Sequence, residues 1–514
     1  MEPKVTQPKR LRCRDKNVSN WMKQIAVFLL VLFLTAAACD PGIKWDEQLK
    51  SNSLAVADSL THDLKPWQVP LKTCKVEDHG AVPDGKTLNT TAIQAAIDAC
   101  SSSGGGVVLF SSGDYVTGTI VLRSKVMLEV AKGARILGST SLADYPEKIE
   151  SLKSFVSEEL KVRQSLIYAE NVSDIGIRGK GELYFRGERL NFPGSGNTGD
   201  VAGRPFGIRI IQSKNVVLKG VTLRNAAAWM QSYIDDENLI FDGIKVVNHA
   251  NTNNDGLDLV SCRNVWVQNT FINAEDDALC LKGTGDHSSE NILIENSTFV
   301  STCNALKIGT ETQGSFNNIV ARNLILGGIP EPLETSSHER EAHSGITLAT
   351  VDGGNLEDIA ISNITINQAR CPIFIRLGKM ERTLGGEKKP GPGDLQRVSI
   401  EHVFGERNYR QGSFISGIAG YPVRDIVLRD IHLSMEGGGT VEMANSPVDE
   451  SDANYPDAKW FSGSGLPSYG FFVRHAVNIV LDDVSVSPIT PDSRPFSRFG
   501  GDVQYVTVNG DPIK

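Results

Sequence analysis

The chain has 514 residues, 40% of them hydrophobic and 22% charged, with a formal net charge of −9. This composition predicts a folded protein, long for one compact core but ordinary for a repeat protein that grows by adding coils. No basic stripe follows the first residues, which argues against nucleic acid as a partner. A polyanionic partner stays open, because a groove can be locally basic on an acidic protein.

Residues 1–39 are typical of an export signal region. Met22-Lys23, an alternative start, precedes an apolar stretch from Ile25 to Thr35, and small residues then lead to Cys39. The stretch is too short to span a bilayer comfortably. A cysteine after small residues is similar to the lipobox of bacterial lipoproteins, although Ala36 stands where that pattern usually has Leu. We expect an exported protein, either a cell-envelope lipoprotein with a lipid anchor at Cys39 or a secreted one.

Residues 40–70 are predicted to be a linker, and residues 71–514 a single domain. This domain opens with a strand and turn, followed by helical spacing from Asn89 to Ala99 and a sharp turn at Gly104-Gly105-Gly106 into a buried strand. A helix in that place would cover the open end of a solenoid, which solenoids need for solubility.

The rest of the chain repeats one phrase: a polar residue, three or four β-formers, a short polar corner and more β-formers. The phrases start near Asn171, Asn215, Asn238, Asn264, Asn291, Asn318, Asp358, Arg397, Asp425 and Asn478. Such a period predicts coils of a β-solenoid whose neighbouring strands lie about 4.8 Å apart. Longer insertions, such as Glu381 to Asp394 and Met435 to Ser468, are expected to line a binding groove.

The most informative motif is Asn253-Asn254-Asp255-Gly256-Leu257-Asp258, followed by Glu275-Asp276-Asp277. Asp255 and Asp276 are 21 residues apart, about one coil, so three carboxylates should stack on one face. Repulsion among crowded carboxylates raises one pKa while others stay ionised. One protonated acid and one ionised base are the equipment of glycoside hydrolysis. We expect Glu275 to point away by strand alternation.

These residues resemble glycoside hydrolase family 28, the polygalacturonase family, over about residues 73 to 510. The opening phrase from Asp78 to Gly85 is shared with several pectin-related β-helix proteins, whereas the order and separation of the two acidic runs are far more specific. The resemblance implies an all-β fold, a right-handed parallel β-helix. It also implies an inverting hydrolase in which Asp276 is the general acid and Asp255 and Asp277 hold and activate the water, with Asp258 supporting the turn.

Two family signatures are missing. The expected Gly-His-Gly aligns with Cys303-Asn304-Ala305, and the expected Arg-Ile-Lys aligns with Thr347-Leu348-Ala349. The chain therefore looks more like the rhamnogalacturonan-type branch, and unbranched polygalacturonate is put in doubt. The candidate substrate-binding residues are Asn304, Lys307, Arg376 and Arg474.

Two other functions stay open. A polysaccharide lyase on the same fold would use Ca²⁺ held by acids and a Lys or Arg base. A glycan-binding β-helix of the adhesin or tailspike kind would keep the fold without the chemistry. For the hydrolase we expect a polysaccharide as partner, a monomer, and no cofactor or metal. No Cys/His spacing suggests zinc, and a Cys74–Cys100 disulfide is left undecided.

Overall fold

The protein is described from a computed structural model that covers residues 41–147, 164–194, 202–284, 287–382, 391–461 and 465–513. The chain divides into two compact units, Met1–Gln48 and Leu49–Lys514. In the first unit, residues 41–48 form the start of helix α2 (Pro41–His62). The predicted export signal and the lipid anchor at Cys39 lie outside the described residues.

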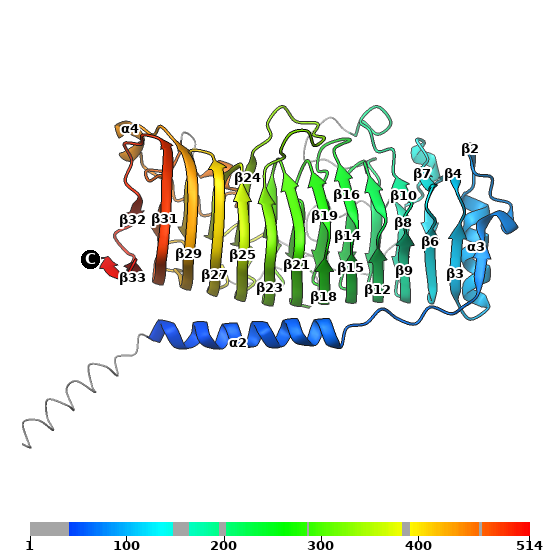
Figure 1. Ribbon diagram of the computed structural model, residues 1–514, viewed down its shortest axis with the longest axis horizontal. Coiled ribbons are helices and arrows are strands. Elements are labelled where there is room, and N and C mark those ends of the chain that lie inside the picture. Colours follow the sequence, from blue (N-terminus) through cyan, green and yellow to red (C-terminus); the bar gives the residue numbers. More distant parts are fainter. Residues whose placement is uncertain are drawn as a thin grey trace, which may run out of the picture. The chain divides into compact units, whose positions relative to one another are not determined.

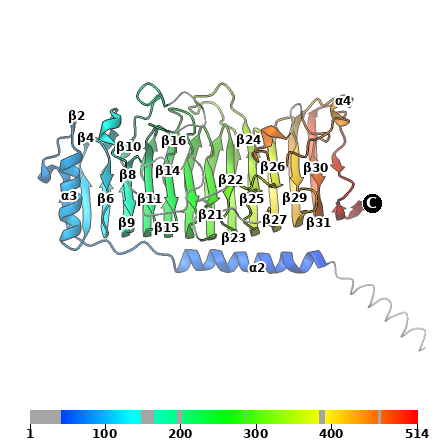
Figure 2. The ribbon, with the colours of Figure 1, turned by 180° about the vertical axis from the view of Figure 1, so that it is seen from behind.

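The described part of the second unit consists mainly of two long sheets (Figures 1 and 2). The first contains β1 (Thr73–Lys75), β2 (Asp84–Leu88), β3 (Gly106–Phe110), β4 (Gly113–Thr117), β6 (Val126–Val130), β7 (Ala134–Gly138), β9 (Ser173–Gly179), β10 (Glu182–Tyr184), β12 (Lys214–Lys219), β13 (Thr222–Arg224), β15 (Glu237–Asp242), β16 (Lys245–Asn248), β18 (Arg263–Gln268), β19 (Phe271–Ala274), β21 (Ser289–Ser301), β23 (Phe316–Gly327), β25 (Leu356–Asn367), β27 (Leu395–Asn408), β29 (Val423–Gly437), β31 (Ala476–Thr490), β33 (Gln504–Val508) and β34 (Asp511–Ile513). The second contains β5 (Ile120–Val121), β8 (Ser165–Glu170), β11 (Phe206–Ile211), β14 (Gln231–Ile234), β17 (Leu257–Val260), β20 (Leu279–Gly283), β22 (Asn304–Thr312), β24 (Ala342–Thr350), β26 (Ala369–Leu377), β28 (Ser413–Ser416), β30 (Phe471–Arg474) and β32 (Ser497–Phe499). Each coil adds strands to both sheets, and the pairing along the coils is parallel, with β33 and β34 forming an antiparallel end. The predicted all-β parallel β-helix is confirmed.

The core is a continuous stack of aliphatic side chains between the sheets. The strand register places one such residue of each coil above its counterpart in the next, as in Val216, Leu239, Val265, Ile292 and Ile319. All five side chains are buried. Because every coil contributes an apolar residue at this place, burial of apolar surface fixes the register from coil to coil.

The polar residue that starts each repeat phrase forms a ladder along the outside of the stack. Asn238, Asn264, Asn291 and Asn318 each donate a side-chain N–H to the side-chain oxygen of the asparagine one coil before, at 3.0–3.2 Å. These asparagines have left-handed backbone, with φ between 54° and 63°. Asn tolerates this conformation better than other residues with a Cβ, so the repeat selects Asn for both its backbone and its amide.

The ladder predicts a graded loss of stability at Asn264. Asn264→Ala loses the hydrogen bonds to Asn238 and Asn291 and places alanine, which tolerates left-handed backbone less well than asparagine, at a positive φ. Asn264→Gly loses the same hydrogen bonds, but glycine adopts this backbone freely. We expect both variants to melt below the wild type, with Asn264→Ala about 1 kcal/mol less stable than Asn264→Gly. Differential scanning calorimetry measures both. Equal melting temperatures for the two variants would mean that the backbone conformation does not select Asn.

Helices lie outside the two sheets. Helix α3 (Thr90–Ser102) lies at one end of the stack, with the predicted pair Ile93 and Ile97 on its buried face, which confirms the N-terminal capping helix (Figure 1). The four remaining described helices are short: η1 (Val76–His79), η2 (Leu142–Asp144), α4 (Val441–Ala444) and η4, which is introduced with the site. Across the described ranges, no helix combines the length and the apolar character needed to cross a membrane.

The residues predicted to be a linker are ordered. Most of them belong to α2, and within the second unit its residues Ala57 and Leu60 pack against Leu293 and Val320 of the first sheet. Trp67 follows, and its indole N–H donates to the carbonyl of Ile175 at 3.2 Å. The segment was expected to be a linker, whereas these apolar side chains pack on a face of the first sheet. The outer bounds of the predicted domains stay a prediction.

Candidate active site

The acidic motif lies where two neighbouring coils enter the second sheet. Asp255 comes just before β17, and Asp276 and Asp277 come just before β20. The pairing of Leu257 with Leu279, and the bond from the Gly256 N–H to the Asp277 carbonyl at 2.9 Å, place Asp255 one coil from Asp277. The structure therefore brings the predicted acids together, with Asp277 rather than Asp276 directly stacked on Asp255. Asp255 and Asp277 are 3% exposed, and Asp276 is more accessible.

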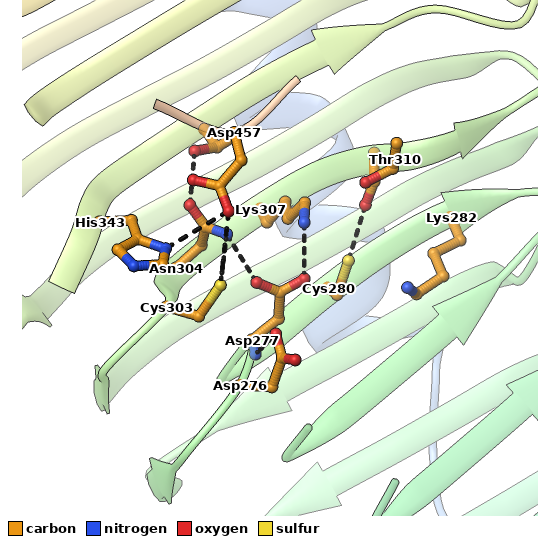
Figure 3. Close-up of polar contacts among 12 residues, drawn as sticks. Asp276, Asp277, Cys280, Lys282, Cys303, Asn304, Lys307, Thr310, His343 and Asp457 are labelled. Carbon is orange, nitrogen blue, oxygen red and sulfur yellow. Dashed lines mark hydrogen bonds and ion pairs between the residues drawn. The ribbon is translucent and has the colours of Figure 1, made fainter. Parts of the chain in front are cut away.

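Asp277 is held by two residues of the next coil, Asn304 and Lys307 of β22 (Figure 3). The Asn304 amide donates to Oδ1 at 2.7 Å, and the Lys307 ammonium donates to Oδ2 at 2.8 Å. Burial raises the pKa of Asp277, but the charges of Lys307 and Lys282 and the two hydrogen bonds outweigh it, so the pKa lies below its ordinary value. Asp277 is therefore the ionised carboxylate of the site.

Asn304 and Lys307 were both predicted to bind substrate, and the structure places them differently. Both side chains are almost fully buried, and both face Asp277. The Asn304 oxygen in turn accepts hydrogen bonds from Ser344 at 2.7 Å and from Thr347 at 3.1 Å. These contacts fix the amide orientation, so both residues position Asp277 rather than present a free group to a ligand.

The other two predicted catalytic acids have pKa values shifted upward. Burial and then the charge of Asp277 raise the pKa of Asp276, against the opposing charge of Lys307. Burial and then the charges of Asp258 and Asp276 raise the pKa of Asp255 well above its ordinary value. The site thus contains one ionised carboxylate beside two that retain protons more strongly, which is the division that acid–base chemistry on one bond requires.

Three further residues beside the acids were not predicted to belong to the site. Cys303 precedes β22, His343 lies on β24, and Asp457 caps η4 (Ala458–Trp460) in the segment between Met435 and Ser468. In Figure 3 their side chains face one another beside Asp276 and Asp277. Lys459 of the same segment lies 3.6 Å from Asp457 and is 40% exposed. The insertion predicted to line the groove therefore does reach the acids.

Arg376 and Arg474, predicted to bind substrate, have structural contacts instead. Arg376 is 1% exposed and donates to Ser416 at 2.9 Å, to the Gly417 carbonyl at 2.8 Å and to the Glu450 carbonyl at 2.9 Å. Arg474 is 5% exposed and donates to the Val448 carbonyl at 2.7 Å. Because backbone carbonyls use these donors, both guanidinium groups hold the segment around Glu450, and we do not retain them as ligand contacts.

A buried ion network lies beside the acids and was also missed. Lys282 lies 3.6 Å from Asp258 and 3.1 Å from Glu311, and its ammonium stands 4.3 Å above the centre of the Trp229 ring. Burial raises the pKa of Glu311, but the charges of Lys282 and Arg382 bring it to about 2. Asp258 is fully buried in this network, which agrees with a supporting role.

Glu275 was expected to point away from the acids. Burial and then the charge of Asp276 raise its pKa to about 8, and the charges of Arg204 and Lys459 also act on it. Glu275 therefore belongs electrostatically to the site. Strand alternation did not apply, because the residue follows the last residue of β19 (Ala274) and lies in the corner between strands.

Comparison with known proteins identifies the family. The family model described as "Glycosyl hydrolases family 28" matches residues 122–452, which is more than half of the chain. The chain belongs to glycosyl hydrolases family 28. A second model, "Rhamnogalacturonase A/epimerase, pectate lyase-like", matches residues 73–133.

Two curated relatives are similar over part of their length. A "Probable polygalacturonase" of Vitis vinifera is 25% identical over 58% of this chain and 61% of its own length. An "Exo-poly-alpha-D-galacturonosidase" of Dickeya chrysanthemi is 26% identical over 52% of both chains. The chain thus spans between half and two thirds of these relatives.

A solved structure supports the fold. The exopolygalacturonase from Thermotoga maritima superposes with a TM-score of 0.63 at 18% identity, covering 90% of this chain and 97% of its own. At this identity the likeness concerns the fold, which is the same parallel β-helix.

Proposed function

We propose that this family 28 member is an exported glycoside hydrolase that cleaves a uronate-containing polysaccharide of the pectin class. The observation that carries the proposal is the cluster of Asp255, Asp276 and Asp277 on neighbouring coils, in which Asn304 and Lys307 hold Asp277 by hydrogen bonds of 2.7 and 2.8 Å. In this cluster the pKa of Asp276 is raised and that of Asp277 is lowered. Both curated relatives are named as enzymes that act on galacturonate polymers, and this supports the proposed substrate class.

In the proposed mechanism, Asp276 is the general acid. It is the most accessible of the three acids, and its raised pKa lets it keep a proton to give to the leaving glycosidic oxygen. Asp277 stays ionised beside Lys307 and acts as the base that takes a proton from the attacking water. Asp255, stacked on Asp277, holds that water. Water attack opposite the leaving group inverts the anomeric carbon.

Recognition of a uronate requires a cation at the accessible surface of the site. Arg376, Arg474 and Lys307 are used inside the protein, so we propose Lys459, whose side chain is partly exposed. Burial lowers the pKa of Lys459, but the charges of Asp457, Cys303 and Asp276 outweigh burial and raise it. A lysine ammonium binds a carboxylate as a point charge and tolerates several geometries. At the position of the family histidine this chain has Asn304, so the side chain there differs in shape and charge from the polygalacturonase pattern.

The substrate expectation is tested with two polymers. Because Asn304 replaces the family histidine and the Arg-Ile-Lys set is absent, we expect a higher kcat/KM on rhamnogalacturonan than on unbranched polygalacturonate. Reducing-end assays on both polymers measure the ratio, and NMR of the first-formed anomer reports inversion. Equal or better activity on polygalacturonate would refute the substrate assignment, and an unsaturated product that needs Ca²⁺ would establish the lyase instead.

A further inference from the structure

We propose that Cys303, His343 and Asp457 form a binding site for a soft divalent cation such as Zn²⁺, placed against the catalytic carboxylates. Ligand atoms of the three side chains all lie within 4.8 Å of one another. Cys303 lies just before β22, His343 lies on β24 and Asp457 lies just before η4, so the site exists only in the folded chain. A thiol, an imidazole and a carboxylate are all zinc ligands.

The separations fit a tetrahedral ion. Zinc bonds of about 2.3 Å to sulfur and about 2.0–2.1 Å to nitrogen and oxygen imply about 3.3 Å between nitrogen and oxygen, and about 3.6 Å between sulfur and oxygen. In the structure, His343 Nδ1 lies 3.3 Å from Asp457 Oδ2, and Cys303 Sγ lies 3.8 Å from the same oxygen (Figure 3). The three groups therefore need only small rotations to share one ion.

The chemistry of the three groups favours an ion over a proton relay. Cys303 Sγ and His343 Nδ1 both face Asp457 Oδ2, and the Nδ1 contact has the distance of an ion pair without the alignment of a hydrogen bond. The other oxygen of Asp457, Oδ1, accepts a hydrogen bond from the backbone N–H of Lys459, which fixes the orientation of the carboxylate. Lys459 Nζ also lies near Oδ2, but this side chain is 40% exposed, so its ammonium can turn toward solvent.

A fourth ligand is available from the catalytic acids. Cys303 also belongs to a second group with Asp276 and Asp277, whose ligand atoms lie within 4.8 Å of one another. On binding, the thiol releases its proton to water, and Zn²⁺ exchanges bound waters for sulfur, nitrogen and oxygen. An ion held by Cys303 would therefore draw on the Asp276 carboxylate. If the proposed function holds, zinc should inhibit hydrolysis by occupying the general acid.

Isothermal titration calorimetry with Zn²⁺ on the purified protein tests the site. We expect one tight site that Cys303→Ala and His343→Ala each weaken at least tenfold, and no comparable binding of Ca²⁺, which prefers oxygen ligands. Cys74→Ala and His79→Ala, a thiol and an imidazole from the capping region, are the matched controls and should bind as the wild type does. Wild-type affinity in Cys303→Ala would overturn the proposal.

Two further measurements keep the test decisive. Asp430, His432 and Asp483 form a surface group that also offers metal ligands. The His432→Ala variant shows how much of the binding heat in the titration comes from this group. Cobalt added to the wild type should give a thiolate-to-cobalt charge-transfer absorption. This absorption requires a cysteine ligand, and the measurement needs no variant, so misfolding of a variant cannot affect it. Its absence would also refute the site. If the protein binds zinc but hydrolyses no pectic polymer, the proposed function is refuted and the proposed metal site is supported.

Discussion

The Asp276→Asn variant should lose about 10²–10⁴-fold in kcat on the best polymer, because an amide cannot donate the proton that the leaving oxygen needs. A Michaelis–Menten comparison with the wild type measures the loss. Asp98→Asn, the same chemical change on the exposed face of α3, is the matched control and should keep wild-type turnover. Near wild-type turnover of Asp276→Asn would remove the residue from the acid role.

Stability gives an independent reading of the same variant. Burial and Asp277 raise the pKa of Asp276 in the folded state, so the folded protein binds its proton more tightly than the unfolded chain does. For the wild type, the free energy of unfolding therefore falls as pH rises from the ordinary Asp pKa to the raised one. Asp276→Asn lacks this fall, and its melting temperature at neutral pH should equal or exceed that of the wild type. An inactive but unfolded variant would be recognised by its lowered melting temperature.

The fold was predictable because each coil repeats the same physical solution. Asn238, Asn264 and Asn291 mark the repeat in the sequence. In the structure each adopts left-handed backbone, and its side-chain amide forms a hydrogen bond with the asparagine of the neighbouring coil. The capping helix was predictable from the spacing of Ile93 and Ile97. The helical segment at 41–62 was not, because its partners, Leu293 and Val320, lie far along the chain.

The site was predictable only where its residues are close in sequence or one coil apart. The order and separation of the acidic runs predicted Asp255, Asp276 and Asp277, and the family resemblance indicated Asn304, which stands where the missing Gly-His-Gly signature is expected. The metal candidate was invisible, because Cys303, His343 and Asp457 show no zinc-like spacing and meet through two coils and an insertion. Arg376 and Arg474 have the right charge, but a sequence does not show that the backbone carbonyls of Glu450 and Val448 in the insertion already accept hydrogen bonds from them.

Lys307 separates two roles that the sequence could not tell apart. If it binds substrate, its loss should raise KM at every pH. If it keeps Asp277 ionised, its loss should raise the pKa of Asp277, because the strongest opposing charge and a 2.8 Å hydrogen bond disappear. The structure favours the second role, since the Lys307 side chain is 1% exposed and its ammonium faces the carboxylate.

We therefore expect the acidic limb of the kcat/KM profile to move to higher pH in Lys307→Met, with activity partly recovered in more alkaline buffer. Lys307→Arg keeps the charge and should move it less. Lys282→Met is the matched control: its ammonium contacts Asp258 and Glu311 and acts on Asp277 only from farther away, so its limb should move less than that of Lys307→Met. An unmoved limb with a raised KM would return Lys307 to substrate binding.

The same substitution should also lower stability by about 3–5 kcal/mol at neutral pH, the usual cost of leaving a buried charge without its partner. The pKa of Asp277 is lowered in the folded wild type, so its contribution is present above the ordinary Asp pKa and is lost as pH falls through the lowered one. In Lys307→Met that contribution is absent.

The gap in the free energy of unfolding between the two proteins should therefore be largest at neutral pH and narrow in acid, where Asp277 is protonated in both. Melting curves measured from neutral to acidic pH test this, and a gap that stays constant across that range would mean that Lys307 stabilises the fold by packing against Tyr455 rather than through the charge of Asp277.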